Sequence, residues 1–145
     1  MIRPALVAVL LAVPAIASAE PPAPGIYSNV TLSEESGDLG GAELELIGTG
    51  ADARVEFVLC EGWCNEILRA PVTFTPDGFG FSYTPHWFDE NGEPVAGPTY
   101  HAEVERKGSG VTITITQTDT PDSFFGYVLR PIEQRFGLDV AAAED

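Results

Sequence analysis

Short runs in which apolar and polar side chains alternate one by one are the feature that most constrains the fold of this chain. Residues 111–118 read VTITITQT, so that Val and Ile alternate with Thr. A period of two places successive side chains on opposite faces of a β-strand, and one apolar face is typical of a strand that is buried on one side. The same alternation occurs in residues 42–47, 53–60 and 99–106. The sequence therefore predicts an all-β fold.

Turn-forming residues separate these runs and set the number of strands. Asp77-Gly78 predicts a hairpin, because glycine tolerates the positive φ that tight turns require, and Asn91-Gly92 and the KGSG segment at 107–110 predict further reversals. The expected strands number eight and cover residues 25–32, 42–47, 53–60, 71–75, 79–83, 99–106, 111–118 and 124–130.

Closure of the sheet is the expected arrangement of these strands. An open antiparallel sheet would leave two edges with unpaired backbone groups, whereas a single antiparallel eight-stranded up-and-down barrel has none. The strands are mostly joined by short connections, and no long helix is available for a parallel crossover. A two-sheet β-sandwich remains the alternative. Eight strands enclose a space that side chains can fill or that can hold one small ligand.

The end of the chain suggests a short C-terminal helix followed by a tail. Pro131 suits the first position of a helix, Ile132 and Phe136 would share one face, and Gly137 could end it. Residues 138–145 are rich in Ala and end in two acids, and we expect them to be disordered. The barrel domain is therefore expected at residues 25–137.

The first nineteen residues have the organisation of a secretory signal peptide. Arg3 precedes an apolar run at residues 5–16, and Ala17-Ser18-Ala19 gives the small-x-small pattern that signal peptidase recognises. The run is shorter than the ~20 residues needed to cross a bilayer, so we expect no membrane anchor. Cleavage before Glu20 would leave a Pro-rich leader at residues 20–24 and a protein located in the periplasm or secreted.

The chain is strongly acidic. Its formal charge is −15, from 7 Lys and Arg against 22 Asp and Glu, and removal of residues 1–19 would change it to −16 because Arg3 is the one charged residue removed. Nucleic-acid binding depends on Lys and Arg at the phosphates, so we expect no nucleic-acid partner. A cationic partner, in contrast, would be attracted at long range.

Cys60 and Cys64 are the only cysteines, and export predicts a disulfide between them. Because the ring is short, it would stabilise the fold by only roughly 2 kcal/mol, so its main effect would be to constrain one turn. Two thiols are too few for a structural zinc site, and the spacing differs from the C-x-x-C of thioredoxin-type redox centres.

Both ends of the expected barrel carry residues that resemble the lipocalin-type (calycin) pattern. Gly25-Ile26-Tyr27 is similar to the G-x-W that begins the first strand in that family, with Tyr27 where the family has Trp. Leu129-Arg130 stands where the family places an Arg that packs across the Trp. The resemblance implies a barrel whose mouth can hold a ligand, without identifying the ligand.

Candidates for catalysis or metal binding are few. His86 lies near Asp89 and Glu90, whereas His101 falls on the expected outer face of its strand. No nucleophile elbow, zinc-protease motif, phosphate loop or dinucleotide fingerprint occurs, so we expect no enzyme activity and no cofactor. The acidic runs at 34–38 and 89–93 do not have the spacing of an EF-hand loop, and we expect solvated turns there rather than metal sites.

Aromatic residues are the better candidates for binding. Trp63 lies inside the expected disulfide loop, and Tyr83, His86 and Trp87 lie in or beside an irregular connection, so that all four are expected at strand ends, where a barrel opens. They could cap a ligand or contact a protein partner. The alternative is that they close the core of the barrel itself.

These observations leave three functions open, with a monomer expected in each. The first is a non-enzymatic protein that binds a small apolar or amphipathic molecule in a cavity lined by inward residues such as Phe57, Phe74, Phe81 and Ile113. The second is an interaction protein that uses the 60–64 loop to block a cationic envelope hydrolase, because the layout is similar to that of small envelope inhibitors of lysozymes or proteases. The third is a structural module without a ligand.

Overall fold

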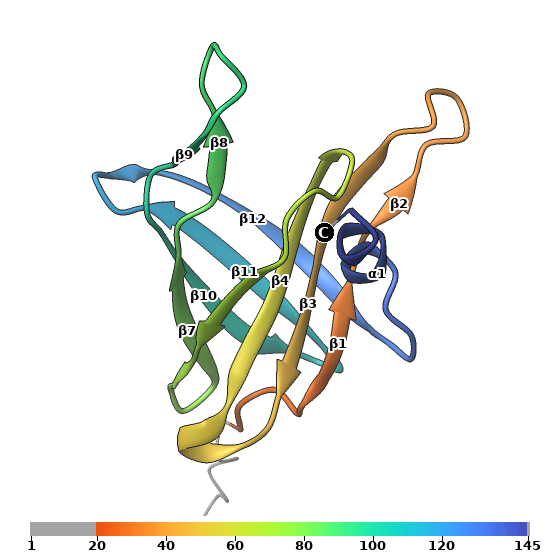
Figure 1. The fold of residues 1–145 in the computed structure, drawn as a ribbon. Helices are drawn as coiled ribbons and strands as arrows, with labels where there is room; N and C mark the ends of the chain where they lie inside the picture. Colours follow the sequence, from red (N-terminus) through yellow and green to blue (C-terminus); the bar gives the residue numbers. More distant parts are fainter. Residues whose placement is uncertain (1–19, 145) are drawn as a thin grey trace, which may run out of the picture.

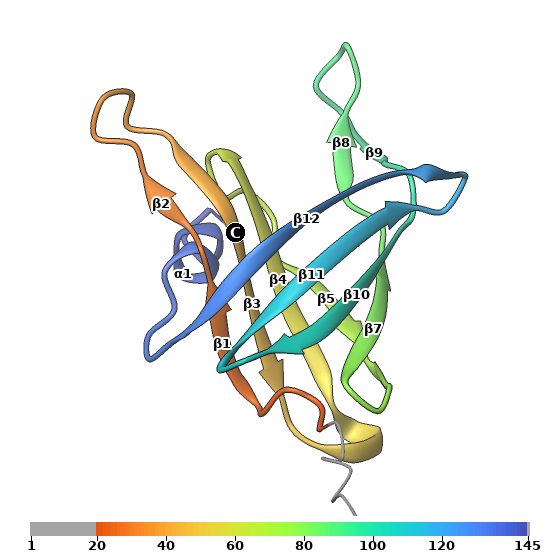
Figure 2. The ribbon, with the colours of Figure 1, turned by 180° about the vertical axis from the view of Figure 1, so that it is seen from behind.

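A nearly closed antiparallel barrel with one short C-terminal helix forms the body of the protein (Figures 1 and 2). The computed structural model describes residues 20–144, so the expected signal peptide lies outside the described residues. The strands are β1 (Gly25–Ser28), β2 (Thr31–Leu32), β3 (Leu39–Ile47), β4 (Arg54–Gly62), β5 (Leu68–Pro71), β6 (Thr73–Phe74), β7 (Gly78–Tyr83), β8 (His86–Phe88), β9 (Pro94–Ala96), β10 (Tyr100–Lys107), β11 (Gly110–Gln117) and β12 (Thr120–Ile132). A 3₁₀ turn, Gly50–Asp52, follows β3, and the helix α1 is Gly137–Ala142.

The order of the strands confirms the predicted up-and-down barrel rather than the sandwich. Neighbours in the sheet run β5-β4-β3-β1-β12-β11-β10-β7-β6, so the first strand lies between β3 and the last strand. The two ends of this order are connected through the chain itself. β5 pairs with β4, β6 pairs with β7, and only Val72 separates β5 from β6. When β1 with β2 and β5 with β6 are each counted as one bent strand, the barrel has the eight predicted strands.

The alternating residues form the interior as predicted, but they fill it. Phe57, Phe81 and Ile113 are at most 3% exposed and pack with the other inward residues in one core, while Phe74 packs against its margin. Fully burying a side chain of this size contributes about 1.5–3 kcal/mol. These side chains are large enough to occupy the space that eight strands enclose, so the hollow at the mouth described below is the better candidate for a ligand.

The predicted short C-terminal helix is present, but it lies later in the chain than expected. Residues 131 and 132 continue β12 and pair with β1, as Pro131 opposite Tyr27 and Ile132 opposite Ile26. Gly137 begins the helix rather than ending it, and residues 138–142, expected to be disordered, are helical. An Ala-rich segment has high helix propensity, and here packing against the barrel supplies the remaining stabilisation.

Helix α1 covers the outer face of β3 and β4 and creates a second core there. Leu138 and Ala141 of the helix are fully buried against Leu39, Val58 and Cys60. Val58 and Cys60 point away from the interior of the barrel, so this part of the sheet is buried on both faces. The alternation in β4 identified the two faces correctly but could not show that the outer one is covered.

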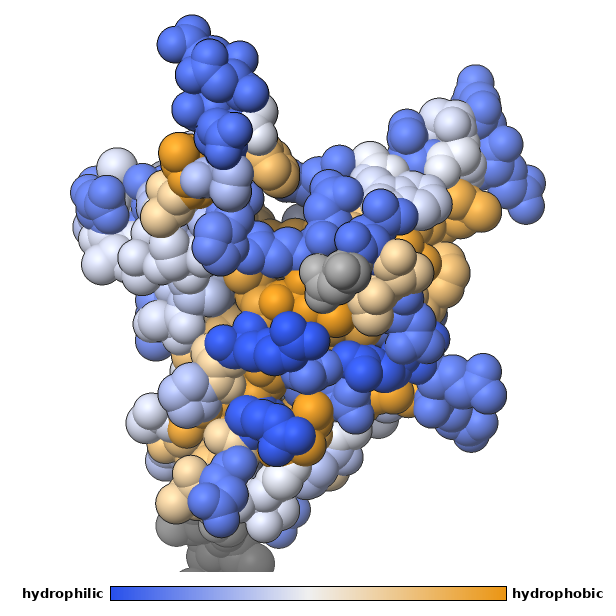
Figure 3. Space-filling model, in the orientation of Figure 1, coloured by the Kyte–Doolittle hydropathy of each residue, from blue (hydrophilic) through white to orange (hydrophobic). Residues whose placement is uncertain are grey.

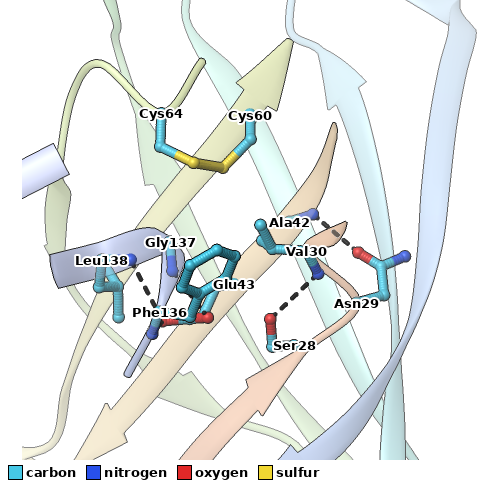
Figure 4. Close-up of a disulfide and its surroundings, with 10 residues drawn as sticks. All are labelled: Ser28, Asn29, Val30, Ala42, Glu43, Cys60, Cys64, Phe136, Gly137 and Leu138. Atoms are coloured by element: carbon cyan, nitrogen blue, oxygen red, sulfur yellow. Dashed lines mark hydrogen bonds between the residues drawn. A yellow bond between two sulfur atoms is a disulfide. The ribbon is translucent and has the colours of Figure 1, made fainter. Parts of the chain in front are cut away.

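Glu43, on the same outer face, is completely buried under the helix. Its carboxylate accepts hydrogen bonds from the backbone N–H groups of Phe136 (2.9 Å), Gly137 (3.1 Å) and Leu138 (3.2 Å) (Figure 4). These donors have no partner within a helix that begins at Gly137, and a negative charge at a helix N-terminus is favourable. The alternation predicted Glu43 on the polar face of its strand, and α1 has removed that face from solvent.

Glycines are required at two of the predicted turns for different reasons. Gly92, in the turn between β8 and β9, has a φ of +79°, as a tight reversal requires. Gly78 follows the turn between β6 and β7 and has no positive φ, so the predicted reason is wrong. A Cβ atom there would lie 1.9 Å from the carbonyl oxygen of Val104, and Gly78 is therefore needed for the close approach of β7 to β10.

Strands β8 and β9 form a two-stranded hairpin, here called the arm, which projects from one end of the barrel (Figure 1). Asp89 accepts hydrogen bonds from the backbone N–H groups of Asn91 (2.8 Å) and Glu93 (2.9 Å), and these bonds lower the pKa of its carboxyl group. The tip of the arm is hydrophilic, and apolar side chains gather at its base (Figure 3). Among residues 20–144, no helix is long and apolar enough to span a membrane.

Candidate ligand site at the mouth of the barrel

The end of the barrel that carries the arm contains a hollow of about 880 Å³, here called the mouth pocket. This volume lies within the range of sites for small molecules, about 300–1,000 Å³. Inward-facing residues of β4, β7, β10 and β12 form its walls, and the arm and the segment after β4 form its rim. The lining consists of Leu59, Glu61, Asn65, Glu66, Leu68, Tyr83, Pro85, His86, Trp87, Phe88, Tyr100 and Phe125.

The pocket is open at one side because β12 is longer than its neighbour. On that side, β1 pairs only with residues 130–132 of β12. Within the described part of the chain, no strand pairs with the earlier residues of β12 on this edge, although β11 pairs with them on the other. Phe125 therefore lines the pocket from a part of β12 that is paired only with β11.

Aromatic rings form the wall of the pocket in one continuous series. Tyr83 and Tyr100 are paired across β7 and β10, and their rings stack with centroids 5.4 Å apart. Tyr100 meets Phe125 edge to face at 6.4 Å, and Phe125 meets Tyr127 in the same way at 6.2 Å. Below them, Phe57 packs against Tyr83 at 5.5 Å and joins the wall to the filled core.

The hydroxyl group of Tyr83 is a polar atom without a partner at the base of this wall. Tyr83 is 6% exposed, and among the described residues its hydroxyl has no hydrogen-bond partner. Burial raises the pKa of Tyr83, and Tyr100, Tyr127 and Glu61 raise it further, so the phenol is neutral at physiological pH. A buried hydroxyl without a partner is unfavourable by about 1–3 kcal/mol, and a bound molecule could supply the missing hydrogen bond.

His86 is held at the base of the arm by Glu66 rather than by Asp89 or Glu90, which the sequence offered as partners. Its Nδ1 lies 2.6 Å from Oε1 of Glu66, and its backbone N–H donates to Oε2 at 3.0 Å. The two contacts connect the arm to the segment between β4 and β5. They therefore fix the position of Trp87, the next residue, at the rim.

The exposed aromatic residues of the arm stand beside the pocket. Trp87 is 52% exposed and Phe88 73% exposed. A side chain at Gly97 would collide with the Trp87 indole, since a Cβ atom there would lie 3.1 Å from the ring. The indole therefore lies against the opposite strand of the arm and presents its other parts to the mouth.

The structure brings three of the four predicted binding residues together. Tyr83, His86 and Trp87 all line the mouth pocket, whereas Trp63 does not and is 42% exposed on the disulfide loop. The predicted disulfide between Cys60 and Cys64 is present. Both cysteines are buried against α1 on the outer side of β4, whereas Glu61 of the same loop lines the mouth pocket.

Several lining residues were not identified from the sequence. Leu59 and Glu61 continue the inward row of Val55 and Phe57, and this alternation could have placed them at the mouth. The alternation in the last predicted strand likewise could have placed Phe125 on the inward face. Glu66 lies in an irregular segment, where no periodicity indicates its direction.

The charges at the rim are predominantly negative. Glu61 and Glu66 are acidic, His86 is bound to Glu66, and the lining contains no Lys or Arg. Burial raises the pKa values of Tyr83 and Tyr127, and the charge of Glu61 raises both further, at Tyr83 after the contributions of Tyr100 and Tyr127. The mouth pocket therefore combines aromatic walls with a negative potential.

His101 lies on the outer face of β10, as predicted, and not at the mouth. Its Nδ1 is 3.1 Å from the hydroxyl of Ser82, and both side chains are exposed. Among residues 20–144, no third side chain hydrogen-bonds to this pair, and no group of three or more His, Cys, Asp or Glu side chains is placed to hold a metal ion.

The residues behind the lipocalin resemblance lie on paired strands, Tyr27 in β1 and Arg130 opposite Ser28 in β12. Tyr27 is buried in the barrel and donates a hydrogen bond from its hydroxyl to the carbonyl of Ala23 at 2.7 Å, while Arg130 is exposed on β12. Burial raises the pKa of Tyr27, and the charge of Arg106 partly offsets this rise. Comparisons with protein-family models, with curated proteins and with solved structures gave no match to this chain.

Proposed function

We propose that this chain is an exported, non-enzymatic protein that binds a small apolar or amphipathic molecule in the mouth pocket. The observation that carries the proposal is a hollow of about 880 Å³ above a filled barrel, with Tyr83, Tyr100 and Phe125 as its walls. Concave sites lined mainly by apolar and aromatic groups, with a few polar atoms, are typical of small-molecule binding. A ligand would lie at the mouth and not in the barrel interior.

The proposal includes export from the cytoplasm and a relationship to lipocalin-type barrels. The signal-like residues 1–19 and the disulfide are both typical of a periplasmic or secreted protein. A monomer would leave the mouth accessible to a ligand.

The test uses two phenylalanines that are neighbours on β12. Phe125 lines the pocket, whereas Phe124 is on the opposite face of the strand and is 70% exposed. The neutral fluorophore N-phenyl-1-naphthylamine should become brighter on titration into the purified chain that begins at Glu20. Phe125→Ser should weaken its binding at least tenfold, and Phe124→Ser should leave it unchanged. A chain that binds no probe, or two variants with equal effects, would contradict the proposal.

A protein partner is a second candidate function, favoured by the exposure of Trp63. The disulfide presents this side chain on a constrained loop, and Trp is over-represented among residues that dominate binding energy. The acidic chain would attract a cationic envelope protein, such as a lysozyme or a protease. In pull-downs at low and moderate salt, Trp63→Ala should abolish capture of such a partner, while Trp87→Ala should not. Capture that is equal with both variants would reject this loop as the contact.

A further inference from the structure

We infer that the mouth pocket selects a hydrophobic organic cation, an amine or quaternary ammonium group that carries an apolar chain or ring, with Glu61 as its counter-charge. The inference rests on the proposed function and specifies the class of ligand. It follows from the position of one carboxylate, from the charges around it and from the aromatic wall that faces it.

Glu61 lies on the inward row of β4, one strand period beyond Leu59. Leu59 still packs against the core, whereas Glu61 is exposed at the rim, where the barrel opens. Its charge acts on the phenols of Tyr83 and Tyr127, which come from two other strands. Its place in the lining puts the carboxylate beside the aromatic wall of the mouth pocket.

No cation of the described chain neutralises this carboxylate. Glu61 forms no ion pair among residues 20–144, whereas the other acid of the lining, Glu66, is engaged by His86. An anionic molecule in the pocket would be repelled by Glu61, and a neutral one would gain nothing from it. A cation would gain an attraction that partial burial strengthens.

The walls suit the same class of ligand. The rings of Tyr83, Tyr100, Phe125 and Trp87 offer π faces, and cations are attracted to the faces of aromatic rings. An apolar tail would bury its surface against the same rings and against Leu59 and Leu68. The unpartnered hydroxyl oxygen of Tyr83 can accept a hydrogen bond from an ammonium N–H group.

The experiment compares three molecules with the same ten-carbon tail: decyltrimethylammonium, decanol and decanoate. Each is titrated at concentrations too low for it to aggregate into the chain that begins at Glu20, with calorimetry and with tryptophan fluorescence as readouts; a Trp63→Phe background isolates the signal of Trp87. The cation should bind at least tenfold more tightly than the other two, and added salt should weaken its binding while leaving that of decanol unchanged.

Two variants with the same change of charge locate the effect. Glu61→Gln should reduce the affinity for decyltrimethylammonium about tenfold and leave that for decanol unchanged. Glu103→Gln, on the exposed outer face of β10, is the matched control and should change neither. Thermal unfolding should show both variants folded, since both side chains are exposed.

The outcomes separate this inference from the proposed function. Equal binding of the three molecules, or an unchanged affinity in Glu61→Gln, would overturn selection of a cation while the pocket remained a binding site. Failure of all three to bind, together with failure of N-phenyl-1-naphthylamine, would overturn both.

Discussion

The buried carboxylate of Glu43 accepts the backbone N–H of Gly137 at 3.1 Å and thereby fixes the C-terminal helix to the outside of the barrel. The two residues are 94 positions apart in the sequence. Glu43 also accepts hydrogen bonds from the N–H groups of Phe136 and Leu138. One carboxylate is therefore the acceptor for three backbone donors at the beginning of α1.

Replacement of Glu43 by Ala should destabilise the protein by about 3 kcal/mol, because buried donors would lose their acceptor. Urea unfolding followed by far-ultraviolet circular dichroism measures this. Glu45→Ala is the matched control: Glu45 lies on the same face of β3 and forms an ion pair with Arg135 at 3.3 Å, and its loss should change stability by under about 1 kcal/mol. Equal losses in the two variants would show that the hydrogen bonds to α1 do not stabilise the fold.

Acidification should protonate Glu56, which binds Arg135 just before α1, and should thereby weaken the attachment of the helix. Burial opposes ionisation of this carboxyl group, but the hydrogen bonds and charges of Arg69 and Arg135 outweigh burial and lower its pKa below the ordinary value of 4.5. A lowered folded-state pKa gives stability that is present above pH 4.5 and is lost as the pH falls through the folded-state value. Glu56→Gln should therefore be less stable than the wild type at neutral pH, and the difference should disappear on acidification. Urea unfolding at several pH values measures it, and a difference that is independent of pH would contradict this account.

Removal of the unpartnered hydroxyl of Tyr83 should stabilise the free protein. Tyr83→Phe keeps the ring and removes a buried polar atom, so the free energy of unfolding should rise by about 1 kcal/mol. Tyr100→Phe is the control, because its half-buried hydroxyl is not among the buried atoms without a partner, and its effect should stay within about 0.5 kcal/mol. Thermal unfolding without ligand provides the comparison. A destabilised Tyr83→Phe variant would mean that the hydroxyl has a partner in solution.

Replacement of Gly78 by Ala should be severely destabilising, by roughly 3 kcal/mol or more, because its Cβ would lie 1.9 Å from the carbonyl oxygen of Val104. The strands β7 and β10 would have to separate. At Gly40 in β3, a Cβ would meet nothing within 4 Å, so Gly40→Ala should be tolerated. Denaturant unfolding of both variants tests this, and similar stabilities would show that β7 can move without loss.

The sequence by itself determined the faces of the strands. In β11, Val111, Ile113 and Ile115 are buried, and the intervening Thr residues point outward, as the period of two requires. Side-chain direction in a strand is a local property, and so are the tight turn at Gly92 and the disulfide across five residues. For this reason the eight strands, the hairpins and the Cys60–Cys64 bond could all be predicted from local patterns.

Only the tertiary structure decided what covers each face and what meets at the mouth. Nothing near Glu43 in the sequence indicates that a helix 94 residues later buries it, and nothing near His86 indicates that Glu66 holds it. Phe125 and Glu61 likewise line one pocket only because β12 begins and β4 ends at the same end of the nearly closed barrel. Contacts of this kind depend on strand order and on closure of the barrel, which are set by pairing between distant segments and therefore leave no periodic signal in the sequence.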